Sequence, residues 1–330
     1  MIRYYFAGDD GCVSDRHVSH YRDIAAGGQG LIVQEATCVS YEGRWVTSQL
    51  GIWSDQHIEG LRRITDAVHE ANGKIFIQLH HAGARCWHDP VGPGVCSALR
   101  GFNGPQTSRA LPADEIAAIV RAFGEAAVRA VESGYDGIEI HGAHGYLISS
   151  FLNSELNRRE DAYGQDRALL SREVLSAVRN AVGPDVIVGF RIGGFEPDFN
   201  TGMENALSLA AMGADFLDIS FGCDPQTADP PAGFPYPPPF YAAMRVKECV
   251  DIPVFGVQHV TGPGLAGEIL NYTDIDMIDI GRGVLINPSW ANDALAGRDV
   301  GECLDCKICL WRIDYTKCPG RIKFLKSRGA

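Results

Sequence analysis

The sequence predicts an α/β fold in which strands and helices alternate, so that the strands form one parallel sheet. Short apolar runs recur along the chain, and segments with helical apolar spacing lie between them. The candidate strands occupy residues 30–35, 74–79, 137–141, 186–191, 216–220, 253–257 and 277–281. The clearest candidate helices occupy residues 55–72, 113–133, 167–182 and 201–212. Seven such units favour a closed (β/α)8 TIM barrel over an open sheet.

Closing the ring requires an eighth strand. Residues 8–11 are typical of a turn, so this strand is expected within residues 1–6, either shortened or continuing upstream of Met1. The chain has no Gly-x-Gly-x-x-Gly motif between a strand and a helix, and a second, dinucleotide-binding domain is therefore not expected. We predict a barrel over residues 1–297 and a short cysteine-rich segment over residues 298–330.

Composition excludes several classes of protein. The 330 residues are 45% hydrophobic and 21% charged, which is ordinary for a globular protein, and they carry a net charge of −12. A nucleic-acid surface needs clustered Lys and Arg, so nucleic acid is not an expected partner. No run approaches the length of a membrane span and the N-terminus lacks a signal peptide, which predicts a cytoplasmic protein. A homo-oligomer is the default expectation for such an enzyme.

Polar side chains follow the predicted strands. They are Glu35 and Thr37 beside Ala36, then Gln78, His80 and His81, then His141, His144 and Tyr146, then Arg191, and finally Arg282 after Gly281. Active sites of barrels lie at the C-terminal ends of the strands, so one face is expected to collect these groups. Histidines offer N–H donors near neutral pH, and a tyrosine hydroxyl can supply a proton.

Each of these residues also has a purely structural interpretation. A histidine can cap the next element, Gln78 can be a buried amide satisfied by backbone, Arg191 can form an internal ion pair, and Arg282 can simply begin a helix. Taken together, the residues favour a flat, polar, phosphorylated cofactor, because the Gly281-Arg282 turn can bind phosphate.

Several motifs resemble those of the Old Yellow Enzyme family of FMN-dependent oxidoreductases. Residues 10–37 resemble the early segment of that family, and residues 78–83 resemble its Gln-Leu-x-His-Ala-Gly signature. The most specific match runs from residue 134 to residue 147, GYDGIEIHGAHGYL, and continues through residues 151–164. The resemblance extends from residue 1 to about residue 297.

The resemblance implies an FMN site. Ala36 and Gln78 would contact the flavin ring, Arg191 would lie beside its N1 and O2 edge, and Gly281 with Arg282 would bind the phosphate. Two positions depart from the family pattern: Gln258, where relatives usually have a small residue near the phosphate, and Ile2, where they often have Thr or Cys near the flavin.

The resemblance also implies a reaction. His141 and His144 would hydrogen-bond the carbonyl oxygen of an α,β-unsaturated substrate, hydride would pass from the flavin to its β-carbon, and Tyr146 would protonate its α-carbon. Tyr4 would border the substrate pocket, and NAD(P)H would supply the electrons. The substrate itself is a small molecule that the loops at residues 86–107 and 223–240 do not identify.

Four cysteines near the C-terminus suggest a metal centre. Cys303, Cys306, Cys309 and Cys318 have the spacing C-x2-C-x2-C-x8-C. This tail resembles the [4Fe–4S] segment of the trimethylamine dehydrogenase and dienoyl-CoA reductase branch, although its last gap is shorter, and a structural zinc is the alternative. One alternative function is an amine dehydrogenase or demethylase that passes electrons through the cluster to a partner. Another is a flavin-free barrel that serves as a binding or scaffold subunit, which Gln258, Ile2 and the shortened first strand suggest.

Overall fold

The strands form one parallel sheet that curls into an arc. The computed structural model describes residues 6–86, 91–92, 108–222, 229–312 and 314–329. In that part of the chain the sheet has seven strands in the order β1-β2-β5-β6-β7-β8-β9. The bounds are β1 (Ile32–Cys38), β2 (Ile75–His80), β5 (Gly137–Gly142), β6 (Ile187–Gly193), β7 (Leu217–Ser220), β8 (Val254–Val257) and β9 (Met277–Asp279). All neighbouring pairs are parallel.

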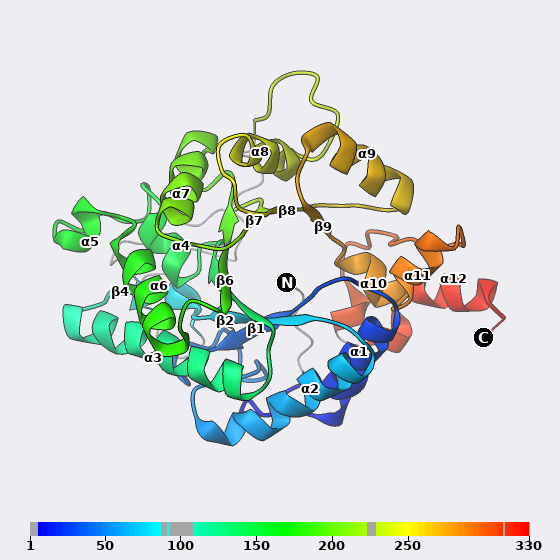
Figure 1. Cartoon of the computed structure of the whole chain (residues 1–330), viewed down its shortest axis with the longest axis horizontal. Coiled ribbons are helices and arrows are strands. Elements are labelled where there is room, and N and C mark those ends of the chain that lie inside the picture. The colour runs from blue at the N-terminus through cyan, green and yellow to red at the C-terminus, as the bar shows by residue number, and fades with distance from the viewer. Residues whose placement is uncertain (1–5, 87–90, 93–107, 223–228, 313, 330) are drawn as a thin grey trace.

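The helices lie outside the arc of strands (Figure 1). The helices between or before the strands are α1 (Asp15–Ala26), α2 (Ile58–Glu70), α3 (Ala113–Glu132), α6 (Leu169–Val182), α7 (Phe199–Ala211), α8 (Pro238–Lys247) and α9 (Pro263–Thr273). Shorter helices are α4 (Leu147–Leu152), α5 (Ala162–Gln165), α10 (Arg282–Ile286) and α11 (Trp290–Leu295), and α12 (Pro319–Ser327) ends the chain. None of the described helices is long and apolar enough to cross a membrane.

The seven predicted strands and four predicted helices are confirmed, with shifted ends. The strand β1 continues to Cys38, because Cys38 bridges to Gly51, so Glu35, Ala36 and Thr37 lie inside the strand instead of after it. The strand β9 ends at Asp279, two residues earlier than expected. The predicted eighth strand falls almost wholly on residues 1–5, outside the described residues.

The structure also has elements that the sequence analysis did not name. A short parallel pair joins β3 (Val91–Gly92) to β4 (Arg109–Ala110) beside the main sheet. The Pro-rich stretch at residues 229–239 leads into the first residues of α8, since proline fits the first turn of a helix. The loop residues 87–90, 93–107 and 223–228 lie outside the described residues.

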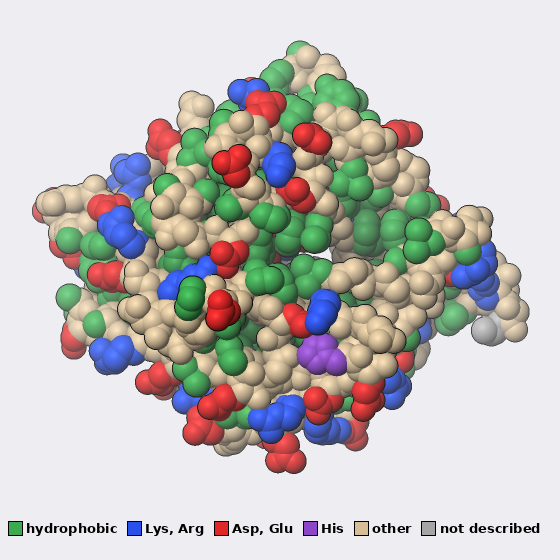
Figure 2. All heavy atoms as spheres, viewed as in Figure 1, with side chains coloured by type: hydrophobic (Ala, Val, Ile, Leu, Met, Phe, Trp, Pro, Cys, Tyr) green, Lys and Arg blue, Asp and Glu red, His purple; other side chains and the backbone are tan. Residues whose placement is uncertain are grey.

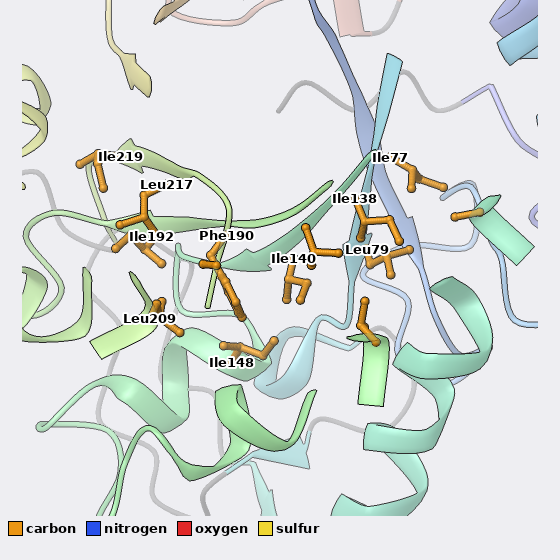
Figure 3. Close-up of a cluster of buried hydrophobic side chains, with 14 of the residues drawn as sticks. Ile77, Leu79, Ile138, Ile140, Ile148, Phe190, Ile192, Leu209, Leu217 and Ile219 are labelled. Carbon is orange, nitrogen blue, oxygen red and sulfur yellow. The ribbon is translucent and has the colours of Figure 1, made fainter. Parts of the chain in front are cut away.

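The main hydrophobic core lies between the sheet and the helices. Alternate strand residues point outward, as Ile138 and Ile140 do on β5 and Phe190 and Ile192 do on β6 (Figure 3). Each of these four side chains is at most 1% exposed. This period of two leaves the intervening residues, Glu139 and Arg191 among them, to point into the interior of the barrel.

A second, small core closes one end of that interior. Phe76, Phe216 and Phe255 pack against one another, and the rings of Phe216 and Phe255 are stacked with centroids 5.0 Å apart. Glycines on the neighbouring strands make room for them: a Cβ at Gly137 would lie 2.5 Å from the Phe76 ring, and one at Gly189 would lie 2.4 Å from Phe216. In the end-on view of Figure 2 the face is hollowed at its centre, with hydrophobic side chains around the hollow.

The C-terminal segment packs against the barrel through Trp311. Its side chain is 5% exposed, and its Nε1–H donates to the carbonyl oxygen of Leu285 at 3.1 Å. Arg328 reaches back to Asp293, with an Nη2 to Oδ2 distance of 2.8 Å. The segment is therefore held beside α10 and α11.

Candidate active site

A layer of polar side chains fills the barrel interior above the aromatic core. Strand register places Gln78 opposite Glu139 and places Arg191 between His141 and Asp218. Gln78 Nε2 donates to Glu139 Oε1 at 2.5 Å, and Arg191 Nη1 donates to Asp218 Oδ2 at 2.5 Å. The sequence predicted Gln78 and Arg191 at this place; Glu139 and Asp218 were not predicted.

The predicted cluster of His141, His144 and Tyr146 is brought together. The rings of His141 and Tyr146 have centroids 5.1 Å apart and meet edge to face, and His80 lies 4.4 Å from Tyr146 in the same manner. His141 Nε2 lies 3.3 Å from His144 Nδ1. His144 Nε2 lies 2.9 Å from the hydroxyl of Ser220, at the end of β7. The two imidazoles are therefore hydrogen-bonded to each other and to the end of the next strand but one.

Burial keeps both imidazoles neutral. Burial, and after it the neighbouring imidazole of His144, lowers the pKa of His141 well below its usual value. Burial and the Arg191 guanidinium do the same to the pKa of His144. The backbone N–H of Ala143 donates to His141 Nδ1 at 3.4 Å, which assigns the proton of neutral His141 to Nε2. That N–H is directed at His144 Nδ1, 3.3 Å away, so His141 donates to His144 in this structure.

A carboxylate from the next loop fixes the turn that carries His144. His144 and Gly145 both have φ of 65°, a left-handed conformation that is costly for histidine. Glu196 accepts the backbone N–H of His144 at 3.0 Å and that of Gly145 at 2.7 Å, and it also contacts the hydroxyl of Ser149. Its side chain is 4% exposed in total, so these contacts are made away from solvent.

We expect Glu196→Gln to destabilise the protein by about 1–3 kcal/mol, because one backbone N–H would then face an amide NH2 and stay unpaired in a buried site. A urea unfolding curve measures this free energy. Glu204→Gln, which changes an exposed glutamate on α7, is the matched control and should unfold with the wild type. Equal midpoints for the two variants would show that Glu196 does not hold the turn.

Arg191 is the only cation among three carboxyl groups in the described part of the interior. Besides Asp218 it contacts Asp279 at the end of β9, with an Nη1 to Oδ2 distance of 3.2 Å. Burial raises the pKa of Asp218 to about 6 and that of Glu139 above its usual range. Burial and the nearby Asp218 carboxylate raise the pKa of Asp279 to about 7. The internal ion pair, which the sequence left open as an alternative, is therefore present.

Four buried atoms in this layer lack a partner in the described residues. They are the acceptors Oε1 of Gln78, Oε2 of Glu139 and Oδ1 of Asp218, and the donor Nε of Arg191. Unpaired buried polar atoms are rare in proteins and call for a ligand or water. An acceptor and a cationic donor fit the polar edge of a flavin ring, so these residues fit the cofactor that the resemblance implies.

The predicted phosphate residues lie elsewhere on the same side of the molecule, at the start of α10. Gly281 precedes this helix and Arg282 begins it. The Arg282 guanidinium forms an ion pair with Asp305 of the C-terminal segment, and its Nη2 lies 2.9 Å from His259 Nδ1. Gln258, which departs from the family pattern, has φ of 156°, a backbone region that favours glycine. The backbone at Gln258 is therefore strained. The turn nevertheless forms with the glutamine side chain in place.

The four cysteines of the tail are not gathered. Among the described residues no three His, Cys, Asp or Glu side chains are arranged to hold a metal ion. Cys306 is exposed, whereas Cys309 and Cys318 pack against the hydrophobic core. The structure therefore does not show the metal site that the cysteine spacing predicts.

Some predicted contacts cannot be placed. Tyr4 and Ile2 lie outside the described residues. Ala36, by contrast, lies inside β1, is 7% exposed, and its carbonyl oxygen accepts Gln49 Nε2 at 3.0 Å. Gln49 Nε2 also lies 3.0 Å from His80 Nδ1, so Ala36 is tied to the histidine cluster.

Comparison with known proteins finds relatives that match most of this chain. The model of a family described as NADH:flavin oxidoreductase / NADH oxidase matches residues 1–300. An NADH oxidase of Thermoanaerobacter brockii is 35% identical over 92% of this chain, and the chain spans 49% of that relative. An NADPH dehydrogenase of Halalkalibacterium halodurans is 35% identical over 89% of this chain and 87% of its own length.

Solved structures share the fold. Morphinone reductase is 26% identical, has a TM-score of 0.78 and covers 96% of this chain and 90% of its own. A 2-naphthoyl-CoA reductase has a TM-score of 0.85 at 22% identity, and this chain spans 52% of it, so that likeness concerns the fold alone. The chain therefore matches some relatives over nearly their whole length and others over about half.

Proposed function

This chain belongs to the NADH:flavin oxidoreductase / NADH oxidase family of FMN-dependent oxidoreductases, and we propose that it reduces the activated C=C bond of an α,β-unsaturated carbonyl compound with electrons from NAD(P)H. The observation that carries this proposal is the contact of His141, His144 and Tyr146 at the barrel end that also holds Arg191. Neutral donors, a proton source and a cation meet there.

In this proposal Gln78, Ala36 and Arg191 hold the flavin ring. The unpaired Oε1 of Gln78 accepts from the ring edge, and the unpaired Nε of Arg191 donates to it. Gly281 and Arg282 hold the phosphate, for which Arg282 would exchange its exposed ion pair with Asp305. The bound FMN supplies hydride transfer.

The protein residues polarise and protonate the substrate. The Nε2–H of His141 exchanges its contact with His144, and the Nε2–H of His144 its contact with Ser220, for the carbonyl oxygen of the substrate. The negative charge of that oxygen grows as the double bond is reduced, so both donors stabilise it. Burial holds both rings neutral, so they act as hydrogen-bond donors that leave the proton delivery to Tyr146. The Tyr146 hydroxyl then protonates the α-carbon. Tyr4 is proposed to border the same pocket.

The direct test is a turnover assay with purified protein, FMN, a cyclic enone and either NADH or NADPH. We expect oxidation of one of the two nucleotides that depends on both FMN and the enone, with the saturated ketone as product. Amine oxidation with an artificial electron acceptor, without enone reduction, would favour the amine dehydrogenase alternative. A protein that binds no FMN would fit only the scaffold alternative.

The cysteine segment carries a separate proposal that rests on its spacing alone. Four thiolates can hold zinc or a [4Fe–4S] cluster if the segment closes around the metal. We expect elemental analysis of anaerobically purified protein to find about one zinc or about four irons per chain, and Cys306→Ser to remove them.

The matched control for the metal analysis is Cys249→Ser, which changes an exposed cysteine outside the segment and should leave the metal content unchanged. Protein with less than about a tenth of a metal ion per chain would contradict the metal centre and leave four free thiols.

A further inference from the structure

We infer that Asp279 is a proton-accepting residue of the FMN site: it shares the Arg191 guanidinium with Asp218, and it takes up a proton from solvent when reduction adds negative charge to a cofactor held at Arg191. This inference rests on the proposed function. It assigns a role to a carboxyl group that none of the sequence motifs includes.

The Arg191 guanidinium contacts two carboxylates, those of Asp218 and Asp279. Nη1 of Arg191 lies 2.5 Å from Asp218 Oδ2 and 3.2 Å from Asp279 Oδ2. Asp218 is fully buried, whereas the Asp279 side chain keeps 28% of its surface exposed. Asp218 is therefore the permanent partner of Arg191, and Asp279 is the partner with access to solvent protons.

The charged groups that act on Asp279 and its partner Arg191 lie on β5, β6 and β7. Arg191 on β6 stabilises its ionised form, whereas Asp218 on β7 disfavours it. Glu139 on β5 also acts on Arg191. On β8 the register partner of Asp279 is the apolar Val257, and α9 outside the strand carries only an exposed Glu268 in its described sequence. With all three carboxyl groups ionised, the cluster would hold one positive and three negative charges.

A further negative charge next to Arg191 would therefore be repelled by carboxylates that already outnumber the single cation. Adding it raises the free energy of ionised Asp279, because like charges in a poorly solvated site repel strongly. Protonation of Asp279 removes that repulsion and leaves Arg191 to the cofactor and Asp218. In the balanced step NAD(P)H supplies two electrons as hydride, and water supplies the proton that neutralises the Asp279 carboxylate.

The test is a potentiometric titration of the FMN-loaded protein between about pH 7.5 and about pH 9, where ionised Asp279 predominates before reduction. The steepness with which the reduction potential falls with pH gives the number of protons taken up per two electrons. We expect about two for the wild type and about one for Asp279→Asn. Asp251→Asn, at an exposed carboxyl group in the loop before β8, is the matched control and should behave as the wild type.

A titration of the FMN-free protein provides an independent readout. Carboxyl bands in infrared difference spectra should show Asp218 titrating near pH 6 and a further group near pH 7 that disappears in Asp279→Asn. If the wild type binds FMN but Asp279→Asn takes up as many protons as the wild type, the inference is wrong and the proposed function stands. If the wild type binds no FMN, the proposed function fails and this inference fails with it.

Discussion

Replacing Tyr146 with phenylalanine is expected to slow reduction of the enone by about 10²- to 10⁴-fold, the usual contribution of a positioned proton donor. The phenyl ring can keep the edge-to-face contacts with His80 and His141, whose centroids lie 4.4 Å and 5.1 Å from that of Tyr146. The change therefore removes the hydroxyl and little else. FMN affinity and the rate at which NAD(P)H is consumed in the first half-reaction should not change. Stopped-flow measurement of the two half-reactions separates these effects.

Tyr272→Phe is the matched control for this experiment. Tyr272 lies at 52% exposure on α9, so loss of its hydroxyl should leave both half-reactions at the wild-type rate. The proton-donor role of Tyr146 would be refuted by a variant that reduces the enone within about threefold of the wild-type rate.

Replacing Arg191 with methionine is expected to lower the free energy of unfolding by about 3–5 kcal/mol, because it leaves Asp218, Glu139 and Asp279 without a countercharge in a buried layer. Asp218 and Glu139 are each 0% exposed. The same variant should bind FMN poorly, since the donor to the ring edge is lost. Urea unfolding of the flavin-free protein measures the change in the free energy of unfolding without any contribution from FMN binding.

The loss should also grow with pH. Burial raises the pKa values of Asp218 and Asp279 above those of an unfolded chain, and Arg191 opposes this rise. A carboxyl group whose pKa is higher in the folded protein keeps its proton there, so its contribution to stability is lost as pH rises through that folded value. The deficit of Arg191→Met should be small near pH 5 and should widen above pH 6 to 7.

Arg63→Met is the comparison for this prediction. Arg63 contacts Asp15 on the surface, with side-chain exposures of 48% and 89%, and such pairs contribute about 0–1 kcal/mol. Adding Asp218→Asn to Arg191→Met should recover part of the lost stability. Equal unfolding midpoints for Arg191→Met and Arg63→Met would rule out the buried charge cluster.

The strands and the histidine cluster could be predicted because their signals are local. Apolar runs bounded by glycine mark β5 and β6, and His141, His144 and Tyr146 lie within six residues of one another. The barrel rule then places the strand ends on one face. Arg191 was found in the same way, as the polar residue near the end of β6.

The partners of these residues could not be predicted, because they depend on register between strands. Asp218 is 27 residues from Arg191 and Asp279 is 88 residues away, and each sits inside an apolar run where one polar residue gives no sign of its partner. Glu196 follows β6 in a loop, and its contacts with the backbone of His144 and Gly145 leave no sequence signal. The alternation of apolar and polar residues at 217–220 was the one available hint that Asp218 and Ser220 point inward.

The metal centre that the cysteine spacing predicts is not shown by the structure. In the described residues Cys309 and Cys318 pack against the core, and Cys306 is exposed. The spacing of cysteines indicates which thiols can reach a common metal ion. It does not indicate whether these thiols pack in the hydrophobic core instead. The contact of Arg282 could not be predicted from the sequence either. Its ion pair with Asp305 joins the barrel to the C-terminal segment.

The central claim is that the polar strand ends of this barrel hold FMN. Titration of flavin-free protein with FMN, followed by the quenching of flavin fluorescence, tests it most directly. We expect saturable binding of about one FMN per chain that Arg191→Met weakens strongly. Fluorescence that stays at the level of free FMN over the whole titration, with wild-type protein that is folded, would contradict it.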